Sequence, residues 1–129
     1  MPPLVAIVDD DPSIRNATGD FLRAAGFAIA TFEDAESFLE SGSRARAACL
    51  IADMRMPGLS GLELYQALVA SGDHIPTVLI SGHWEEATQS RVHAAGITCY
   101  LAKPFEPDQL LECIGEAMAR SGRPSIPRL

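Results

Sequence analysis

Five short apolar runs alternate along the chain with longer segments in which apolar residues recur at helical spacing. The runs predict β-strands over 4–8, 27–32, 48–52, 75–80 and 97–102. The first of them, Leu-Val-Ala-Ile-Val, contains no polar residue, as expected of a strand buried on both faces of a sheet. The second is predicted to be an edge strand.

The segments between the runs predict five helices, over 12–25, 35–41, 61–71, 85–95 and 107–120. Asp11, Asp34 and Ser60 are placed to cap the first three, because a side-chain oxygen there can accept hydrogen bonds from the unpaired N–H groups of the first turn. The fourth helix is unusually polar. A helix with so little apolar surface is expected to pack loosely and to be able to rearrange.

The alternation of strands and helices predicts an α/β fold of five βα units. Parallel neighbours need crossover connections, so the helices should cover both faces of a parallel sheet. Such sheets bind ligands beyond the carboxyl ends of the strands. We expect a single domain over 1–120, followed by a flexible C-terminal tail or linker start over 121–129, which is rich in Gly, Pro, Ser and Arg.

Composition narrows the class of protein. The chain has 129 residues, 47% of them hydrophobic, which is enough for one domain with a core. Its net charge of −7 argues against direct nucleic-acid contact and is compatible with a metal cation or a basic protein partner. No run approaches the ~20 apolar residues of a membrane span, and no signal-like start is present, so a cytoplasmic location is expected. Cys49, Cys99 and Cys113 show no zinc or redox spacing and are predicted to be small core residues.

Charged residues follow three of the predicted strands. Asp9-Asp10-Asp11 comes after the first strand, Asp53 after the third and Lys103 after the fifth. These strand ends should meet at one edge of the sheet, where gathered carboxylates are costly unless a cation or a reaction requires them. A lysine among them suggests a bound phosphate. The pattern therefore indicates chemistry on an aspartate, assisted by a divalent metal.

Four segments carry a resemblance to a known family: IVDDD at 7–11, ADMRMPGLSG at 52–61, LISG at 79–82 and YLAKPF at 100–105. Together they resemble the receiver domain of bacterial two-component response regulators. The residues at 55–57 and 81–83 are most similar to those of receivers of the nitrogen-fixation regulator type. The resemblance implies a CheY-like, flavodoxin-like (βα)5 doubly wound sheet with strand order 2-1-3-4-5.

The resemblance also implies a phosphorylation site with Mg2+ as its cofactor. Asp53 matches the phosphoacceptor, Asp10 the direct metal ligand, and Asp9 the acid that holds the ion partly through water. Asp53 and the backbone carbonyl of Arg55 would complete the protein ligands, which suffices because Mg2+ keeps several waters. Lys103 matches the cation that pairs with the phosphoryl oxygens, and its bond to the following proline is expected to be cis.

Other matched residues imply a switch. The Ser81 hydroxyl would bond the phosphoryl group, and Tyr100 would then swing inward. N–H groups near Met54 and Gly82 would add hydrogen-bond donors, and Gly82 would leave room for the phosphoryl group. His83 borders the site. The surface that changes would be formed by the fourth helix, the fifth strand and the fifth helix.

The resemblance implies partners rather than a separate substrate. A sensor histidine kinase or a phosphotransfer protein would donate the phosphoryl group, and a downstream protein or output domain would read it. A homodimer could form on phosphorylation. The chain would not be an enzyme, except that it would catalyse its own phosphorylation and dephosphorylation. It would contact neither nucleic acid nor membrane directly.

Three alternatives remain open at this point. The chain could be the receiver fragment of a longer LuxR-type transcriptional regulator. An aspartyl-phosphate hydrolase would need a second acid two residues after its nucleophile, where this chain has Arg55. A flavin-binding protein would need a Ser/Thr/Gly-rich phosphate loop at 9–11, where three aspartates would repel the phosphate.

Overall fold

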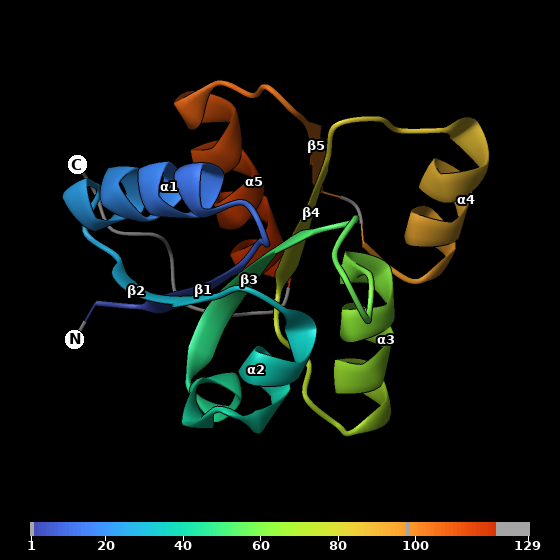
Figure 1. The fold of residues 1–129 in the computed structure, drawn as a ribbon, viewed down its shortest axis with the longest axis horizontal. Helices are drawn as coiled ribbons and strands as arrows, with labels where there is room; N and C mark the ends of the chain where they lie inside the picture. Colours follow the sequence, from blue (N-terminus) through green and yellow to red (C-terminus); the bar gives the residue numbers. More distant parts are fainter. Residues whose placement is uncertain (1, 98, 121–129) are drawn as a thin grey trace.

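A computed structural model describes residues 2–97 and 99–120 and confirms the predicted fold. Five parallel strands form one sheet in the order β2-β1-β3-β4-β5 (Figure 1). The strands are β1 Leu4–Val8, β2 Ala28–Phe32, β3 Ala47–Asp53, β4 Thr77–Ser81 and β5 Tyr100–Ala102. The helices are α1 Pro12–Ala24, α2 Ala35–Glu40, α3 Gly61–Ala70, α4 Glu86–Ala94 and α5 Pro107–Arg120, with a short 3-10 helix, η1, at Gly42–Ala45.

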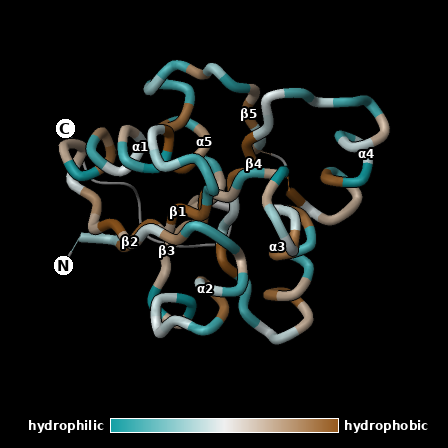
Figure 2. Tube along the Cα trace, viewed as in Figure 1, coloured by the Kyte–Doolittle hydropathy of each residue, from teal (hydrophilic) through white to brown (hydrophobic). Residues whose placement is uncertain are grey.

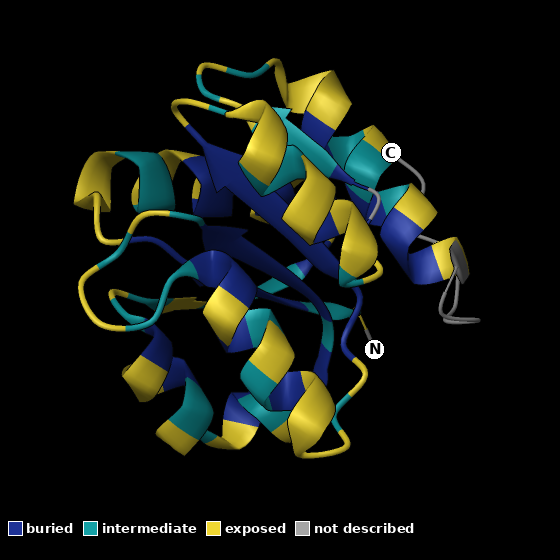
Figure 3. Cartoon of the chain, turned by 90° about the vertical axis from the view of Figure 1, so that its right-hand side faces the viewer, coloured by how far each residue is buried: buried dark blue, intermediate teal, exposed yellow. Residues whose placement is uncertain are grey.

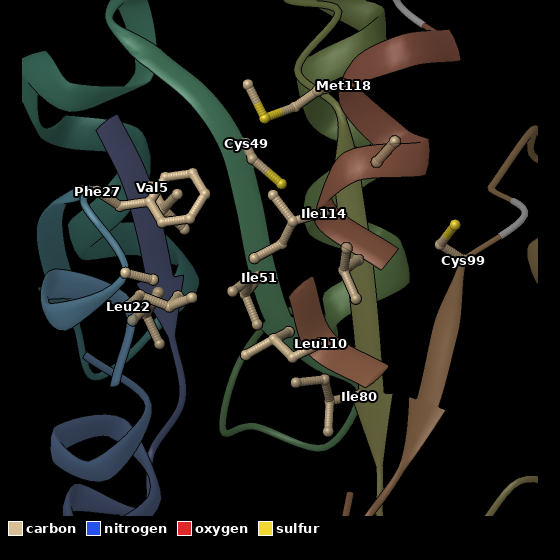
Figure 4. Packing of buried hydrophobic residues seen from close by; sticks show 14 residues of the cluster. Val5, Leu22, Phe27, Cys49, Ile51, Ile80, Cys99, Leu110, Ile114 and Met118 are labelled. Atoms are coloured by element: carbon tan, nitrogen blue, oxygen red, sulfur yellow. The ribbon is translucent and has the colours of Figure 1, made fainter. Parts of the chain in front are cut away.

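The helices cover both faces of the sheet. In Figure 1, α1 and α5 lie on one face and α2, α3 and α4 on the other. The strands are mostly hydrophobic and buried, while the helices turn their polar sides outward (Figures 2 and 3). On the α1–α5 face, Ile114 and Met118 of α5 lie against Cys49 and Ile51 of β3 (Figure 4). The core is therefore two apolar layers separated by the sheet.

The predicted helix caps are confirmed. The Asp11 carboxylate accepts hydrogen bonds from the N–H groups of Ser13 and Ile14, at 2.9 and 3.3 Å. Ser60 forms a reciprocal capping box with Glu63: the Ser60 hydroxyl accepts the Glu63 N–H at 3.1 Å, and the Glu63 carboxylate accepts the Ser60 N–H at 2.9 Å. These local bonds fix where α1 and α3 begin, at the edge where the strands end.

Two strands begin two or three residues later than predicted. β4 begins at Thr77 rather than at residue 75, because Pro76 has no N–H to donate to a neighbouring strand; its carbonyl accepts the Leu50 N–H at 2.8 Å. β5 begins at Tyr100, because the Ile97 N–H bonds the Val92 carbonyl at 3.2 Å and so belongs to the turn that ends α4. The η1 helix was not predicted.

The cysteine prediction fits the structure, since Cys49 and Cys99 are buried and Cys113 is partly buried. The tail predicted over 121–129 lies outside the described residues. None of the helices in the described chain has the length and apolar character needed to cross a membrane.

Candidate functional site

The strand register brings the charged residues together at the carboxyl edge of the sheet. Asp53 ends β3 opposite Ile80 of β4, and Ser81 ends β4 opposite Ala102 of β5. The chain continues the sheet hydrogen bonds one step further, because the Asp9 N–H bonds the Phe32 carbonyl at 3.1 Å and the Lys103 N–H bonds the Ser81 carbonyl at 2.9 Å. The backbone at residues 9, 53, 81 and 103 is thereby held at one edge of the sheet.

Three carboxylates meet at this edge. Asp9, Asp10 and Asp53 each offer one oxygen, and these three atoms lie within 4.8 Å of one another. Asp9 and Asp53 are only 4% and 6% exposed, whereas Asp10 is exposed to solvent. Hard carboxylate oxygens, two of them buried and one open to water, suit Mg2+, which prefers oxygen ligands and retains waters. The residues present therefore fit the predicted metal.

Lys103 supplies the positive charge of the site. Its ammonium donates to Asp53 Oδ2 at 2.8 Å and to Asp9 Oδ2 at 3.4 Å, and the Lys103–Pro104 peptide bond is cis, as expected. Burial of the ammonium opposes its charge, but the hydrogen bond and the charge of Asp53, together with the charge of Asp9, outweigh burial and raise the pKa of Lys103. Lys103 therefore stays protonated beside both acids.

Asp9 is anchored by the first turn of α1. Its Oδ1 accepts the Asp11 N–H at 2.9 Å, and Arg15 Nη1 donates to the Asp9 carbonyl at 2.6 Å. Burial is the main cause that raises the pKa of Asp9; the bond from Asp11 lowers it, the charge of Asp53 raises it further and Lys103 lowers it. The sequence analysis did not predict this role of Arg15. The available signal was a basic residue one helical turn after the three aspartates.

The backbone N–H groups that follow Asp53 have different partners. The Met54 N–H bonds the Ile80 carbonyl at 2.8 Å and is part of the sheet. The N–H that turns toward the acid is that of Arg55, which donates to Asp53 Oδ1 at 3.1 Å. The Arg55 carbonyl as a metal ligand stays a prediction.

Gly61, the first residue of α3, lies directly on the Asp53 main chain. A Cβ at this position would come within 2.7 Å of the Asp53 carbonyl oxygen and 3.0 Å of Leu79 Cδ2. Real Cβ atoms do not approach backbone so closely, so only glycine lets α3 pack here. Gly82 differs, since a Cβ there would meet no heavy atom of the described residues within 4 Å. The described residues around Gly82 therefore do not require glycine, and the room that it would leave for a phosphoryl group stays a prediction.

The Ser81 hydroxyl is bonded within its own loop. It donates to the His83 carbonyl at 2.9 Å and accepts the His83 N–H at 3.2 Å, and the residue is 2% exposed. The His83 side chain itself points to solvent, with Nε2 4.0 Å from Glu85 Oε1. A polar cleft of about 320 Å³, bordered by Arg55 and by Arg91 of α4, opens from Ser81 to the surface.

Tyr100 lies between β5 and α4. Its hydroxyl is 3.3 Å from Gln89 Oε1 and 3.4 Å from His93 Nε2, both on α4. Its ring centroid is 4.7 Å from that of Trp84, whose indole N–H donates to the Leu101 carbonyl at 2.8 Å. The sequence suggested Tyr100 but gave no sign of these neighbours.

An apolar groove of about 440 Å³ lies beside Lys103, between α1 and the start of α5. It is lined by Ile14, Ala17, Thr18, Phe21, Lys103, Pro104, Phe105, Pro107 and Leu110. Because Lys103 lines the groove and also contacts Asp53, the groove adjoins the acidic site.

Comparison with known proteins places this site in a family. The family model of the response regulator receiver domain matches residues 5–115. The transcriptional regulatory protein FixJ of Bradyrhizobium diazoefficiens is 32% identical over 117 residues, covering 91% of this chain and 57% of FixJ. The response regulator protein TodT of Pseudomonas putida is 34% identical over 128 residues, covering 98% of this chain and 56% of TodT.

Solved structures of response regulators have the same fold as this chain. The response regulator StyR superposes with a TM-score of 0.85 and 41% identity, covering 95% of this chain and 62% of StyR. The chemotaxis protein CheY4 of Vibrio cholerae superposes with a TM-score of 0.83 and 28% identity, covering 91% of this chain and 99% of CheY4. FixJ-N gives a TM-score of 0.81 at 31% identity, with coverages of 92% and 95%.

The chain spans little more than half the length of FixJ and TodT. The matches fall within the receiver, and they do not favour the alternative of a LuxR-type regulator fragment over the receiver assignment. The chain therefore belongs to the response regulator receiver domain family, the family that its sequence motifs resemble.

Proposed function

We propose that Asp53 accepts a phosphoryl group from a phosphohistidine, that Mg2+ assists, and that residues 1–120 form the receiver unit that responds. The observation that carries this proposal is the contact of Lys103 with Asp53 at 2.8 Å inside a cluster of three carboxylates. A lysine and a cation site on either side of one carboxylate provide the charge neutralisation that phosphoryl transfer requires.

In the proposed reaction, an oxygen of the Asp53 carboxylate attacks phosphorus while the bond from phosphorus to the histidine nitrogen breaks. The electron pair of that bond returns to the nitrogen while the other ring nitrogen carries a proton, so the products are an acyl phosphate on Asp53 and a neutral histidine on the donor. Lys103 and the Arg55 N–H, which already point at the two Asp53 oxygens, would move to the phosphoryl oxygens. Receiver domains bind Mg2+ at an acidic pocket; here Asp9, Asp10 and Asp53 would hold it, and it would neutralise phosphoryl charge.

The proposed output is a conformational switch, not turnover of a separate substrate. The phosphoryl group adds a charge of roughly −1.5 to −2 and three acceptor oxygens. Ser81 would leave the His83 backbone and donate to one of these oxygens, and Tyr100 would leave α4. The surface of α4, β5 and α5 would change for a downstream protein, an output domain or a second copy of the chain.

The groove beside Lys103 supports a protein as the phosphoryl donor. Its apolar wall on α1, including Ala17 and Phe21, adjoins Asp53 through Lys103. A sensor histidine kinase or phosphotransfer protein could pack an apolar helix in this groove while its phosphohistidine reaches Asp53. The proposal includes a cytoplasmic location, as predicted from the sequence.

The test uses Trp84 as a fluorescent reporter. Beryllofluoride, which mimics the phosphoryl group, should change the Trp84 emission in the presence of Mg2+, because Trp84 follows Ser81 and His83 in the loop proposed to move. Asp53→Asn should abolish the change. Asp20→Asn, the same chemical change on the exposed side of α1, should respond like the unaltered chain. A full response in Asp53→Asn would overturn the assignment of Asp53.

The docking face has a separate test. Ala17→Arg places a charge in the apolar groove at an exposed position, so the fold should tolerate it. Transfer from a phosphohistidine protein should slow at least tenfold, while phosphorylation by a small acyl phosphate should keep its rate. Equal slowing with both donors would contradict docking at this groove.

A further inference from the structure

Trp84 joins two elements that are distant from each other in sequence. It lies in the loop that follows β4, and its indole N–H donates to the Leu101 carbonyl of β5 at 2.8 Å. Leu101 pairs with Ile80 of β4, and the Cys99 carbonyl and the Lys103 N–H, two residues to either side, both bond β4, so the Leu101 carbonyl also faces β4 and the loop that follows it. One side chain thus ties the loop after Ser81 to the last strand.

The same indole packs on Tyr100, which is in turn held by α4. The rings of Trp84 and Tyr100 are 4.7 Å apart at an interplanar angle of 51°, and His93 meets Tyr100 edge-on at 5.5 Å. The Tyr100 hydroxyl is 3.3 Å from Gln89 Oε1. Loop, strand and helix therefore share one aromatic cluster, formed by Trp84, Tyr100 and His93.

This aromatic cluster is a large part of what holds α4 in place. Val92 is the buried residue of α4, and Glu85 at its N-cap makes no side-chain capping bond within the described chain. A helix with so few fixed contacts takes its position from the neighbours that do bind it.

The cluster is linked through the backbone to the phosphoryl site. The Ser81 hydroxyl bonds both the carbonyl and the N–H of His83, the residue that precedes Trp84. For Ser81 to donate to a phosphoryl oxygen on Asp53, the hydroxyl must leave the His83 carbonyl, and the loop that carries Trp84 is then released.

We infer that Trp84 is a positioning residue: its indole N–H bond to Leu101 holds the loop, Tyr100 and α4 in the resting arrangement, and phosphorylation must break this bond. The inference rests on the proposed function of Asp53 and Ser81. The net contribution of one such hydrogen bond, after the loss of its bonds to water, changes an equilibrium constant by roughly two- to twelvefold. If it exists only in the resting arrangement, its loss shifts the population toward the activated one by that factor.

The experiment compares two affinities in the full chain. Trp84→Phe keeps an aromatic ring but removes the N–H. We expect beryllofluoride at saturating Mg2+, titrated by NMR, to bind two- to twelvefold tighter than to the unaltered chain, with an unchanged Mg2+ affinity. A merely structural defect would weaken both. Tyr65→Phe, which removes one polar atom from a half-buried aromatic residue of α3, should change neither affinity.

A second variant covers the case in which Trp84→Phe does not fold. Replacing Trp84 by its benzothienyl isostere keeps the shape of the ring system and deletes only the N–H, and it should tighten beryllofluoride binding by the same factor. Unchanged or weaker beryllofluoride binding in the variant that folds overturns the inference while the proposed function stands. Absence of beryllofluoride binding to the unaltered chain overturns the proposed function instead.

Discussion

Helices α3 and α4 are neighbours on one face of the sheet and have similar lengths, 10 and 9 residues, yet they are held very differently. α3 begins with a two-way capping box and buries Gly61, Leu62, Leu64 and Leu68. Among the residues that the structure describes, α4 has no side-chain capping bond at Glu85, and it buries Val92. Because local stability follows buried apolar contacts and satisfied helix ends, α3 should be part of the rigid frame and α4 should open at low cost.

The difference divides the site into two parts. The first part, β1, β3 and α3, carries Asp9 and Asp53 and packs so closely that Gly61 touches the Asp53 backbone. The second part, β4, α4 and β5, carries Ser81 and Tyr100, whose hydroxyls bond groups within that same part. A receiver needs both properties, since phosphoryl chemistry requires fixed charges and signalling requires an element with two arrangements.

The largest effect is expected from truncating the cores of the two helices. Leu64→Ala in α3 removes a fully buried side chain and should lower the free energy of unfolding by ~2–5 kcal/mol. Val92→Ala in α4 removes less apolar surface and should cost about 1–2 kcal/mol. Urea unfolding measures both, and hydrogen exchange shows where protection is lost. Equal costs, each spread over the whole sheet, would contradict the division.

Mg2+ should stabilise the first part selectively. It is expected to bind the folded acid cluster and not the unfolded chain, so at a hundredfold excess over its Kd it should add about 2.7 kcal/mol to stability, seen as a rise in Tm. Hydrogen exchange should slow in the loops after β1 and β3 and stay unchanged in α4. Asp10→Asn, a change at the exposed residue that is predicted to be a ligand, is the control that should remove the rise. A rise that persists in this variant would place the ion elsewhere.

Two glycines give a matched pair across the division. Gly61→Ala drives a Cβ to 2.7 Å from the Asp53 carbonyl and should cost ~1–3 kcal/mol of stability. Gly82→Ala meets no described heavy atom within 4 Å and should be neutral or slightly stabilising. Thermal unfolding compares them directly. A larger loss in Gly82→Ala would show that the loop after β4 is as tightly packed as the one after β3.

The smallest expected effect concerns the helix caps. Ser60→Ala removes the capping box of α3 and should cost about 0.5–2 kcal/mol. Glu85→Ser gives α4 the cap that it lacks and should slow exchange of its first-turn amides several-fold, with little change in global stability. If exchange in α4 stays as fast, the missing cap is not what loosens this helix.

Local signals explain why much of the fold could be predicted. A capping oxygen at Asp11 or Ser60 bonds N–H groups two or three residues ahead, so the sequence contains both partners. The apolar runs mark the strands, and the rule that parallel strands end at one edge predicts that Asp9, Asp53 and Lys103 lie together, as they do.

What the sequence could not specify depends on contacts between distant segments. Whether the Met54 or the Arg55 N–H faces the acid is decided by how far the pairing of β3 with β4 continues, because a one-residue step reverses the direction of a donor. The bond from Trp84 to Leu101 depends on the position of α4 over β5, which tertiary packing sets. Neither residue pair has a local pattern that would reveal it.

The contacts of Lys103 have a consequence for the order of assembly. Its ammonium joins Asp9 and Asp53 across sequence separations of 94 and 50 residues, and it arrives after the last strand of the sheet. A nascent chain that has formed only β1 and β3 already brings the three acids together, but it lacks the lysine that offsets their repulsion. Synthesis from the N-terminus therefore delays a competent pocket until the fifth strand has joined, so an incomplete chain would make a poor phosphoryl acceptor.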